Sequence, residues 1–520
     1  MKEQPSKLDK AIQYIAPQWA ANRLHARMKI SAAETFRGAS KSSKAMKNWT
    51  SVSGSEDDDV LSSLDTLRVR SRDLENNNPI AKAAIQDAAL YIVGSGPRLN
   101  SQLDREFLGL NAETGKAKES EIQREWKLYA DSPEFDYSRT LNFRGACWQI
   151  FYNALLSGDI FDNLTSLSRP GSPYLTKHQI IEADLCSNPN NVADGMKPSP
   201  RHSPVYGGVQ KNRTTKEPEA YWFANSGGHS ASKWKRIQAY SDNGRRKCIH
   251  IFQQKRPGGS RGIPYLAPVI EPLKQIGRYT EAELMAAVVS GMFTIFVHSE
   301  NGKTINPIAT ANQDTDTNEE IEMGYGAVVG GMGINDKIES ANPGRPNSEF
   351  DPFFMSIVKQ VAAALQMPAE VLLKSYNVSY SAARAALLDA WRFFHTSQQW
   401  LVDQWIQIVY EAWFEEAVAL GRIDAPGYLD GGELVQKAWH GAEWVFPGEG
   451  HIRPDQEMKG VNLRLDAGIS TREEETARIT GGSYHSKVAQ RKDEAAIEKE
   501  IAEITEPPQA EPATETNKDV

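Results

Sequence analysis

The chain has 520 residues, of which 40% are hydrophobic and 24% are charged, and its formal net charge is −8. A single hydrophobic core stops growing at roughly 250–300 residues, so we expect two or more domains, and the ordinary composition excludes global disorder. The acidic balance excludes binding to nucleic acid through an overall basic surface, so a contact with DNA would require local basic patches.

Cysteine usage and hydropathy indicate the compartment. Cys147, Cys186 and Cys248 lie far apart and lack CxxC spacing, which is typical of reduced thiols and argues against a disulfide framework or a zinc site. The first ten residues are polar, and no stretch reaches the roughly 18 uncharged apolar residues that span a bilayer. We therefore predict a soluble chain that is not exported and makes no contact with a membrane.

The N-terminal region changes character near residue 60. Residues 38–59 are rich in Ser and Lys and end in an acidic run, a composition that cannot bury much apolar surface and predicts a mobile arm. The run Asn76-Asn77-Asn78-Pro79 is followed by apolar residues at helical spacing. This pattern predicts a packed helix with proline in its first turn.

The rest of the first half predicts a mixed α/β region. Aromatic and aliphatic residues between Ile122 and Phe161 indicate two helices separated by a polar link at 131–139. Short apolar runs bounded by Gly, Pro and Asn predict strands at 180–184, 220–223, 234–239 and 248–253.

The second half is predominantly helical in its pattern. Three spaced prolines open a long predicted helix at 264–297, and residues 301–346 predict a small β-containing insertion before helical spacing returns at Phe350. A continuous helix over 379–420 would be roughly 60 Å long at about 1.5 Å per residue. Its expected packing residues are Leu387, Trp391, Phe394, Leu401, Trp405 and Ile408. Such a helix requires a second domain or a neighbouring subunit to cover it, and Gln398 is where we expect it to bend.

Motifs of catalysis are incomplete. Gly302-Lys303-Thr304 has the ending of a phosphate-binding loop, but Val297 stands where that loop needs its first glycine. The run 258–262 matches G-x-S-x-G, but Pro257 and Pro264 flank it, so we predict a flexible glycine-rich loop rather than a nucleophile elbow. The ten histidines form no recognisable ligand spacing. We therefore predict no enzyme, no cofactor and no metal.

Landmarks spread from about Arg68 to Ala495 resemble the portal proteins of tailed bacteriophages, specifically the lambda-like family. They are Arg72 to Pro79, Ile92 to Gly96, His250 to Phe252, Arg261 to Pro268 and, most distinctively, Ser379 to Leu388. The C-terminal region 444–468 is also similar, although Arg453-Pro454 replaces a more usual aspartate-proline pair. The order and spacing of these landmarks along the chain carry the resemblance.

The resemblance implies a predominantly helical α+β, multi-domain portal fold assembled as a ring, commonly of twelve subunits. The implied parts are a mobile arm at 1–60, a wing at 61–263, a first stem helix at 264–297, a clip at 298–349, a second stem helix at 350–367, a channel loop at 368–378, a long wing and crown helix at 379–420, a crown at 421–495 and a disordered tail at 496–520. The ring would sit at one capsid vertex of the virion, having assembled in the host cytoplasm.

The implied partners are double-stranded viral DNA, passed without sequence specificity, the terminase large subunit, the major capsid protein and head-completion or tail connector proteins. Candidate residues facing the DNA are Lys374, Tyr376, Asn377 and Arg384. Candidate docking residues in the clip are Asn301, Lys303, Asp314, Asp316, Glu319 and Glu320. An alternative for Arg384 is an ion pair with Asp389 or Glu370 at a subunit contact.

Two other classes of protein compete with this interpretation. A terminase-like or other DNA-processing enzyme would require a phosphate loop or clustered metal carboxylates, and the sequence supplies neither. A different scaffold or shell protein of the virion would share the lack of catalytic motifs, but it should not carry the order of stem, insertion and stem.

Overall fold

The computed structural model describes residues 16–19, 44, 48–49, 53–225, 233–291, 295–298, 337–340, 349–375, 379–448, 454–480, 482 and 484–505. The chain divides into two compact units, Met1–Ser55 and Glu56–Val520, and all that follows concerns the second. Most of the predicted clip lies outside the described residues.

Helix α3 (Glu56–Asn77) begins inside the region predicted to be a mobile arm. Its first turn is the acidic run, and carboxylates are stabilised there because a helix N-terminus carries unpaired N–H groups and a partial positive charge. Glu56 is buried and accepts a hydrogen bond from the Arg256 backbone N–H (3.0 Å). Residues 56–60 therefore belong to a packed helix rather than to an arm.

Helix α4 (Pro79–Ile92) begins where the sequence predicts a helix start. Asn78 is its N-cap, and its Oδ1 accepts hydrogen bonds from the backbone N–H groups of Ile80 (3.0 Å) and Ala81 (3.1 Å). Proline occupies the first helical position, where its missing N–H costs nothing. This prediction is confirmed.

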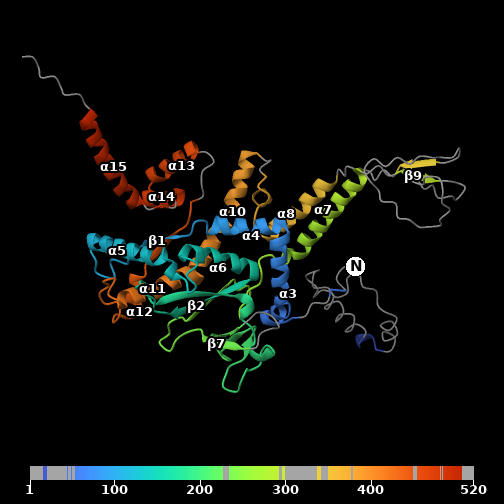
Figure 1. Cartoon of the computed structure of the whole chain (residues 1–520), viewed down its shortest axis with the longest axis horizontal. Coiled ribbons are helices and arrows are strands. Elements are labelled where there is room, and N and C mark those ends of the chain that lie inside the picture. The colour runs from blue at the N-terminus through green and yellow to red at the C-terminus, as the bar shows by residue number, and fades with distance from the viewer. Residues whose placement is uncertain are drawn as a thin grey trace, which may run out of the picture. The chain divides into compact units, whose positions relative to one another are not determined.

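Helices α5 (Ala112–Ala130) and α6 (Phe143–Ser157) come next, and two antiparallel sheets follow them in the chain. The first has the order β3-β2-β8 and the second β4-β5-β6-β7. Strands β2 and β7 are labelled in Figure 1, one in each sheet. The strands are β2 (Asp159–Ser166), β3 (Thr176–Glu182), β4 (Val205–Tyr206), β5 (Val209–Lys211), β6 (Pro218–Ala224), β7 (Trp234–Gln238) and β8 (Cys248–Phe252). The four predicted strands match β3, β6, β7 and β8.

Strand β2 is the central strand of the first sheet, yet the sequence pattern placed its start in a helix. Gly158, with φ 92°, ends α6 and turns the chain directly into β2. The aromatic spacing of the helix continues to Phe161, which is fully buried in the strand. Hydrophobic spacing alone could not mark the change from helix to strand.

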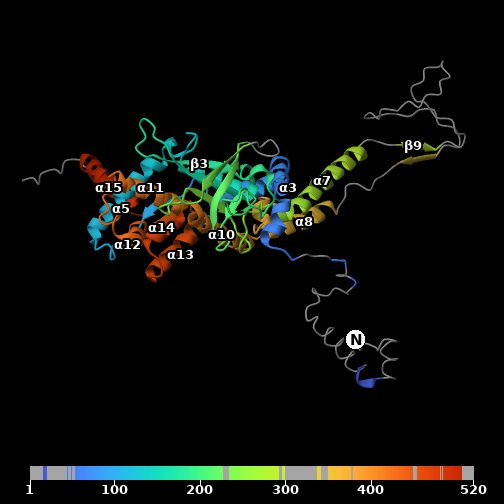
Figure 2. The same cartoon turned by 90° about the horizontal axis from the view of Figure 1, so that it is seen from below.

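Helices α7 (Ile270–Gly291) and α8 (Phe350–Ala364) lie side by side and extend away from the sheets (Figures 1 and 2). The ring of Tyr279 on α7 stacks on Phe350 with centroids 5.4 Å apart. The first predicted stem helix is too long at both ends. A 3-10 turn, Ala267–Val269, precedes α7, and residues 295–298 form strand β9 (Ile295–His298), which pairs with β10 (Lys337–Ser340).

The predicted long helix is present as three consecutive segments. Helix α10 (Tyr380–Leu401) passes through a π-helical turn, Val402–Ile406, into α11 (Gln407–Ala419). The interruption lies four residues beyond Gln398, whose Nε2 instead donates to the Ile92 carbonyl of α4 (3.1 Å). Trp405, inside the π-helical turn, is fully buried.

The region predicted to be the crown is partly built into the main core. Helix α12 (Gly432–Trp439) leads to strand β11 (Ala442–Val445), which pairs with β1 (Arg98–Ser101). Trp439 and Trp444 pack in the large core with the aromatic residues of α5 and α11. Three further helices end the described chain, α13 (Pro454–Asp466), α14 (Arg472–Thr480) and α15 (Tyr484–Thr505). Residues 496–505 are therefore helical rather than part of a disordered tail.

None of the helices in the described part of the chain combines the length and apolarity that a membrane crossing requires.

Candidate functional site

The glycine-rich loop at 256–262 is the first candidate, because it carries a G-x-S-x-G match. It is a fixed loop, not the flexible one predicted. The Ser260 backbone N–H and hydroxyl both donate to the Asp57 carboxylate at 2.7 Å, and Ser260 is buried. A Cβ at Gly262 would lie 2.0 Å from the Gly158 carbonyl oxygen, so only glycine fits there. The motif therefore serves close packing of the chain.

Beside this loop, Asp159 forms the centre of a buried charge cluster with Arg68, Arg261 and His250. Arg261 Nε lies 2.5 Å and Arg68 Nη2 lies 2.7 Å from its carboxylate oxygens, and His250 Nε2 lies 3.1 Å away. Arg261 also donates to three backbone carbonyls, those of Ala183, Cys186 and Gly207. These contacts join α3, both sheets and the loop before α7.

The charges in this cluster compensate one another. Burial would raise the pKa of the Asp159 carboxyl, but Arg261 and Arg68 hold it well below its usual range. Burial lowers the pKa of His250 to about 4, more than Asp159 raises it, so His250 is neutral at pH 7. The cluster has the properties of a structural ion network.

A second buried arrangement, formed by Asp162, His178 and Tyr129, resembles a proton relay. His178 Nδ1 lies 2.7 Å from Asp162 Oδ2, and His178 Nε2 lies 3.1 Å from the Tyr129 hydroxyl. Trp405 Nε1 donates to the same Asp162 oxygen at 2.8 Å. All four side chains are buried, and burial raises the pKa of Tyr129 well above its usual value. A substrate could not reach them, so we interpret this network as a support for the core.

The described residues contain no cluster of three or more His, Cys, Asp or Glu side chains that could hold a metal ion. Their cysteines, Cys147, Cys186 and Cys248, are free thiols and buried.

The junction between α8 and α10 contains the residues predicted to face DNA. Helix α8 ends at Ala364, a short helix α9 (Ala369–Leu372) follows, and Ser379 caps α10 by accepting a hydrogen bond from the Ala382 backbone N–H. The predicted channel loop thus contains a helical turn. Tyr376 and Asn377 lie outside the described residues.

Lys374 lies at the end of α9, where its Nζ is 3.0 Å from Oδ1 of the buried Asp87 on α4. Arg384, in the second turn of α10, is half-buried and also takes part in a contact. Asp389, one of its proposed partners, lies 4.0 Å from Arg392. The assignment of Lys374 and Arg384 to a DNA-facing wall stays a prediction.

The six predicted packing residues lie along one side of α10, the π-helical turn and α11. Phe394, Leu401 and Trp405 are buried, and Leu387, Trp391 and Ile408 are half-buried against the same core. The six clip residues Asn301, Lys303, Asp314, Asp316, Glu319 and Glu320 lie outside the described residues.

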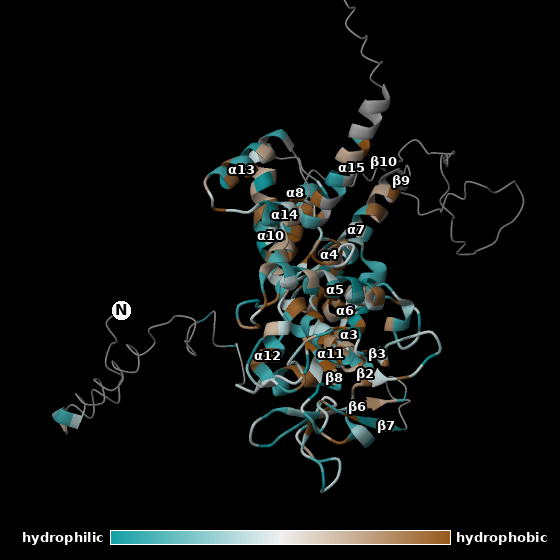
Figure 3. Ribbon diagram, turned by 90° about the vertical axis from the view of Figure 1, so that its left-hand side faces the viewer, coloured by the Kyte–Doolittle hydropathy of each residue, from teal (hydrophilic) through white to brown (hydrophobic). Residues whose placement is uncertain are grey.

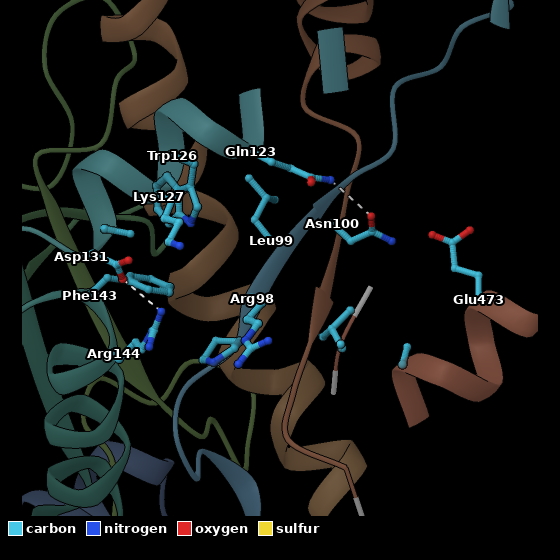
Figure 4. Close-up of a pocket in the computed structure, with 15 residues that line it drawn as sticks. Arg98, Leu99, Asn100, Gln123, Trp126, Lys127, Asp131, Phe143, Arg144 and Glu473 are labelled. Carbon is cyan, nitrogen blue, oxygen red and sulfur yellow. Dashed lines mark hydrogen bonds and ion pairs between the residues drawn. The ribbon is translucent and has the colours of Figure 1, made fainter. Parts of the chain in front are cut away.

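A cavity of about 400 Å³ lies between β1, α5, α6 and α14 (Figure 4). Its floor is aromatic, because the rings of Trp126 and Phe143 meet edge to face with centroids 5.1 Å apart. Arg144 at its rim donates to Asp131 (3.0 Å), and Glu473 approaches from α14. Both signs of charge line the cavity, so it favours no particular ligand.

Sequence reasoning missed Asp87, Asp159 and Arg68, which the structure places in buried ion pairs. One feature of the sequence indicates such a pair: a charged residue on the apolar face of a predicted helix needs a partner when it is buried. Asp87 interrupts such a face in α4. The partners themselves, which are 91 to 287 residues away, could not be read from local spacing.

Comparisons with known proteins identify relatives of this chain. A family model described as "Phage portal protein, lambda family" matches residues 42–398. The chain is 25% identical over 493 residues to Portal protein B of Escherichia phage lambda, covering 91% of each chain. It is 24% identical over 492 residues to the portal protein of Escherichia phage N15, covering 90% of this chain and 91% of that one. A chain from the virion of a native gene transfer agent particle aligns with a TM-score of 0.42 and 11% identity, over 80% of this chain and 92% of that chain.

Proposed function

The chain belongs to the lambda family of phage portal proteins, and from this premise we propose that it assembles into a ring, of about twelve copies by analogy, at one vertex of a capsid. Viral DNA would enter through the ring during packaging and leave through it during ejection. Portal proteins are structural components of the virion, and the role proposed here is mechanical rather than catalytic.

The observation that carries the proposal is a set of large exposed apolar side chains on the α7–α8 pair. Leu284 is 64% exposed, Met285 60% and Phe353 51%, and the brown segments of α7 in Figure 3 mark its apolar residues. Soluble single chains seldom leave several large apolar side chains together on one pair of helices. Neighbouring copies in a closed ring would cover them, because each copy presents this surface to the next.

By analogy with the family, we also propose which elements form each part of the portal. We assign α7 and α8 to the stem, residues 298–349 between them to the clip, the two sheets with α3 to α6 to the wing, and α13 to α15 to the crown. The connection between α9 and α10 is assigned to the channel wall. The net charge of −8 suits a channel, because a wall that bound many phosphates tightly would hinder sliding DNA.

The proposed partners follow from the same role. The clip would dock the terminase large subunit during packaging and then the head-completion or tail connector proteins, and the wing would contact the major capsid protein. Arg384 remains our candidate for a cation that faces the DNA.

Negative-stain electron microscopy of the purified full-length chain tests the proposal. We expect rings with a central hole and rotational symmetry. Closed shells or flat sheets would identify a different virion protein, and monomers at all concentrations would contradict the ring.

A further inference from the structure

A buried carboxylate on α4 lies directly beneath the end of α9. Asp87 is 4% exposed, and its Oδ1 is 3.0 Å from the ammonium group of Lys374, whose side chain is 63% exposed. Lys374 adopts a left-handed backbone conformation, with φ 52°, which is uncommon for lysine. The chain leaves α9 in a bent conformation that places this ammonium group over Asp87.

Asp87 depends strongly on this contact. Its second oxygen, Oδ2, is buried and has no hydrogen-bond partner among the described residues. A carboxylate removed from water is costly unless a cation or several donors compensate it. The ammonium group of Lys374 therefore offsets the cost of burying the Asp87 carboxylate.

Helix α4 also contacts α10, the helix that follows the α9–α10 connection. Gln398 Nε2 on α10 donates to the Ile92 carbonyl at the end of α4 (3.1 Å), and the rings of Tyr91 and Phe394 stack with centroids 5.2 Å apart. One helix thus contacts both α9 and α10. Helix α9 shares the main core with α4 through the buried side chains of Val371 and Leu372, and the ion pair between Lys374 and Asp87 adds a polar contact at its end.

We propose that Asp87 is a positioning residue that fixes the end of α9 on α4, and that Lys374 serves this contact rather than binding DNA. The inference rests on the proposed function, because it concerns the wall of the channel. In this inference the ammonium group of Lys374 stabilises the fold. Helix α4, which contacts both α9 and α10, fixes the two ends of the α9–α10 connection.

The two roles for Lys374 predict different results for substitutions of Asp87. Lys374→Met leaves a buried carboxylate without its cation, so α9 should open more often. Asp87→Asn removes the buried charge and should weaken the contact less. The double variant Asp87→Asn/Lys374→Met contains no uncompensated charge and should therefore resemble Asp87→Asn alone. A lysine that contacts DNA would give no such rescue.

Amide hydrogen exchange on the full-length protein without DNA measures the opening of α9. We expect exchange at residues 370–375 to rise about tenfold in Lys374→Met and by less in Asp87→Asn and in the double variant. Lys359→Met, which removes an exposed lysine from α8, should leave exchange there unchanged and is the matched control. Unchanged exchange in Lys374→Met, or equal exchange in Lys374→Met and the double variant, would overturn the inference.

Protection of packaged DNA from nuclease, measured in particles assembled with each variant, separates this inference from the proposed function. The positioning role predicts that Asp87→Asn restores DNA packaging to the Lys374→Met background. If packaging is lost in Lys374→Met and remains lost in the double variant, Lys374 acts by contacting DNA and the positioning role is wrong. Altered exchange in a protein that forms no rings would leave the contact established and refute the portal role alone.

Discussion

The cluster around Asp159 and the α7–α8 pair differ in where their side chains find partners. Around Asp159, two arginines and a histidine from distant segments of the same chain enclose the carboxylate, so it has a partner on each oxygen without any second chain. On α7 and α8, Leu284, Met285 and Phe353 are left largely exposed. The first region is complete in one chain, whereas the second gains stability only when another surface covers it.

The largest expected effect on stability comes from a substitution in the Asp159 cluster. Arg261→Ala should lower the free energy of unfolding by about 5 kcal/mol, because it leaves the Asp159 carboxylate partly uncompensated and three carbonyls without their donor. Chemical denaturation measures the change. Arg256→Ala, which breaks an exposed ion pair with Asp59 (2.6 Å), is the matched control and should cost less than about 1 kcal/mol. Equal losses in the two variants would contradict the assignment.

Trp405→Ala should cost about 3–5 kcal/mol, because it opens a cavity in the aromatic core. It also removes the Nε1 donor from Asp162, whose other oxygen is buried without a partner among the described residues. Thermal unfolding of this variant beside Trp391→Ala, at a half-buried position, provides the measurement and its control. An unchanged melting temperature in Trp405→Ala would refute the packing role.

Part of the pH dependence of unfolding should come from His440, which is shielded from water in the folded chain. Burial lowers the pKa of His440 to about 4, while an unfolded histidine titrates near 6.5. Between these values the unfolded chain binds more protons, so stability that is present above about pH 6.5 is lost as the pH falls towards 4. His440 should account for about 3 kcal/mol of this loss.

His440→Gln should flatten the dependence of the melting temperature on pH in that range. His485→Gln, at an exposed position on α15, is the control for the substitution itself and should leave the melting temperature at pH 7 close to that of the wild type. An equal slope in the wild type and His440→Gln would show that His440 does not carry the effect.

The fold could be predicted from sequence where its causes are local. Asn78 and Pro79 mark the start of α4 because a cap and a first-turn proline act within four residues. Ser379, where the helix predicted at 379–420 begins, is likewise the N-cap of α10. By contrast, β11 was not predicted, because it is a strand through its pairing with β1, some 340 residues earlier.

The candidate site was less predictable for the same reason. The sequence pattern of 258–262 correctly excluded a nucleophile elbow, but its rigidity comes from Asp57 and Asp159, more than 100 residues away. Lys374 is predicted to face DNA from its place in the predicted channel loop, whereas its contact with Asp87 depends on the packing of α9 against α4. Long-range partners of this kind have no signature in local spacing.

The most direct test of the comparison is the assembly state of Leu284→Glu/Met285→Glu beside the wild type, measured by sedimentation velocity. Both positions are exposed in the single chain, so the free energy of unfolding should change by less than about 0.5 kcal/mol. We predict that the wild type sediments as one large closed assembly and that the variant remains a folded monomer. A variant that sediments like the wild type would contradict the claim that neighbouring copies cover the α7–α8 surface.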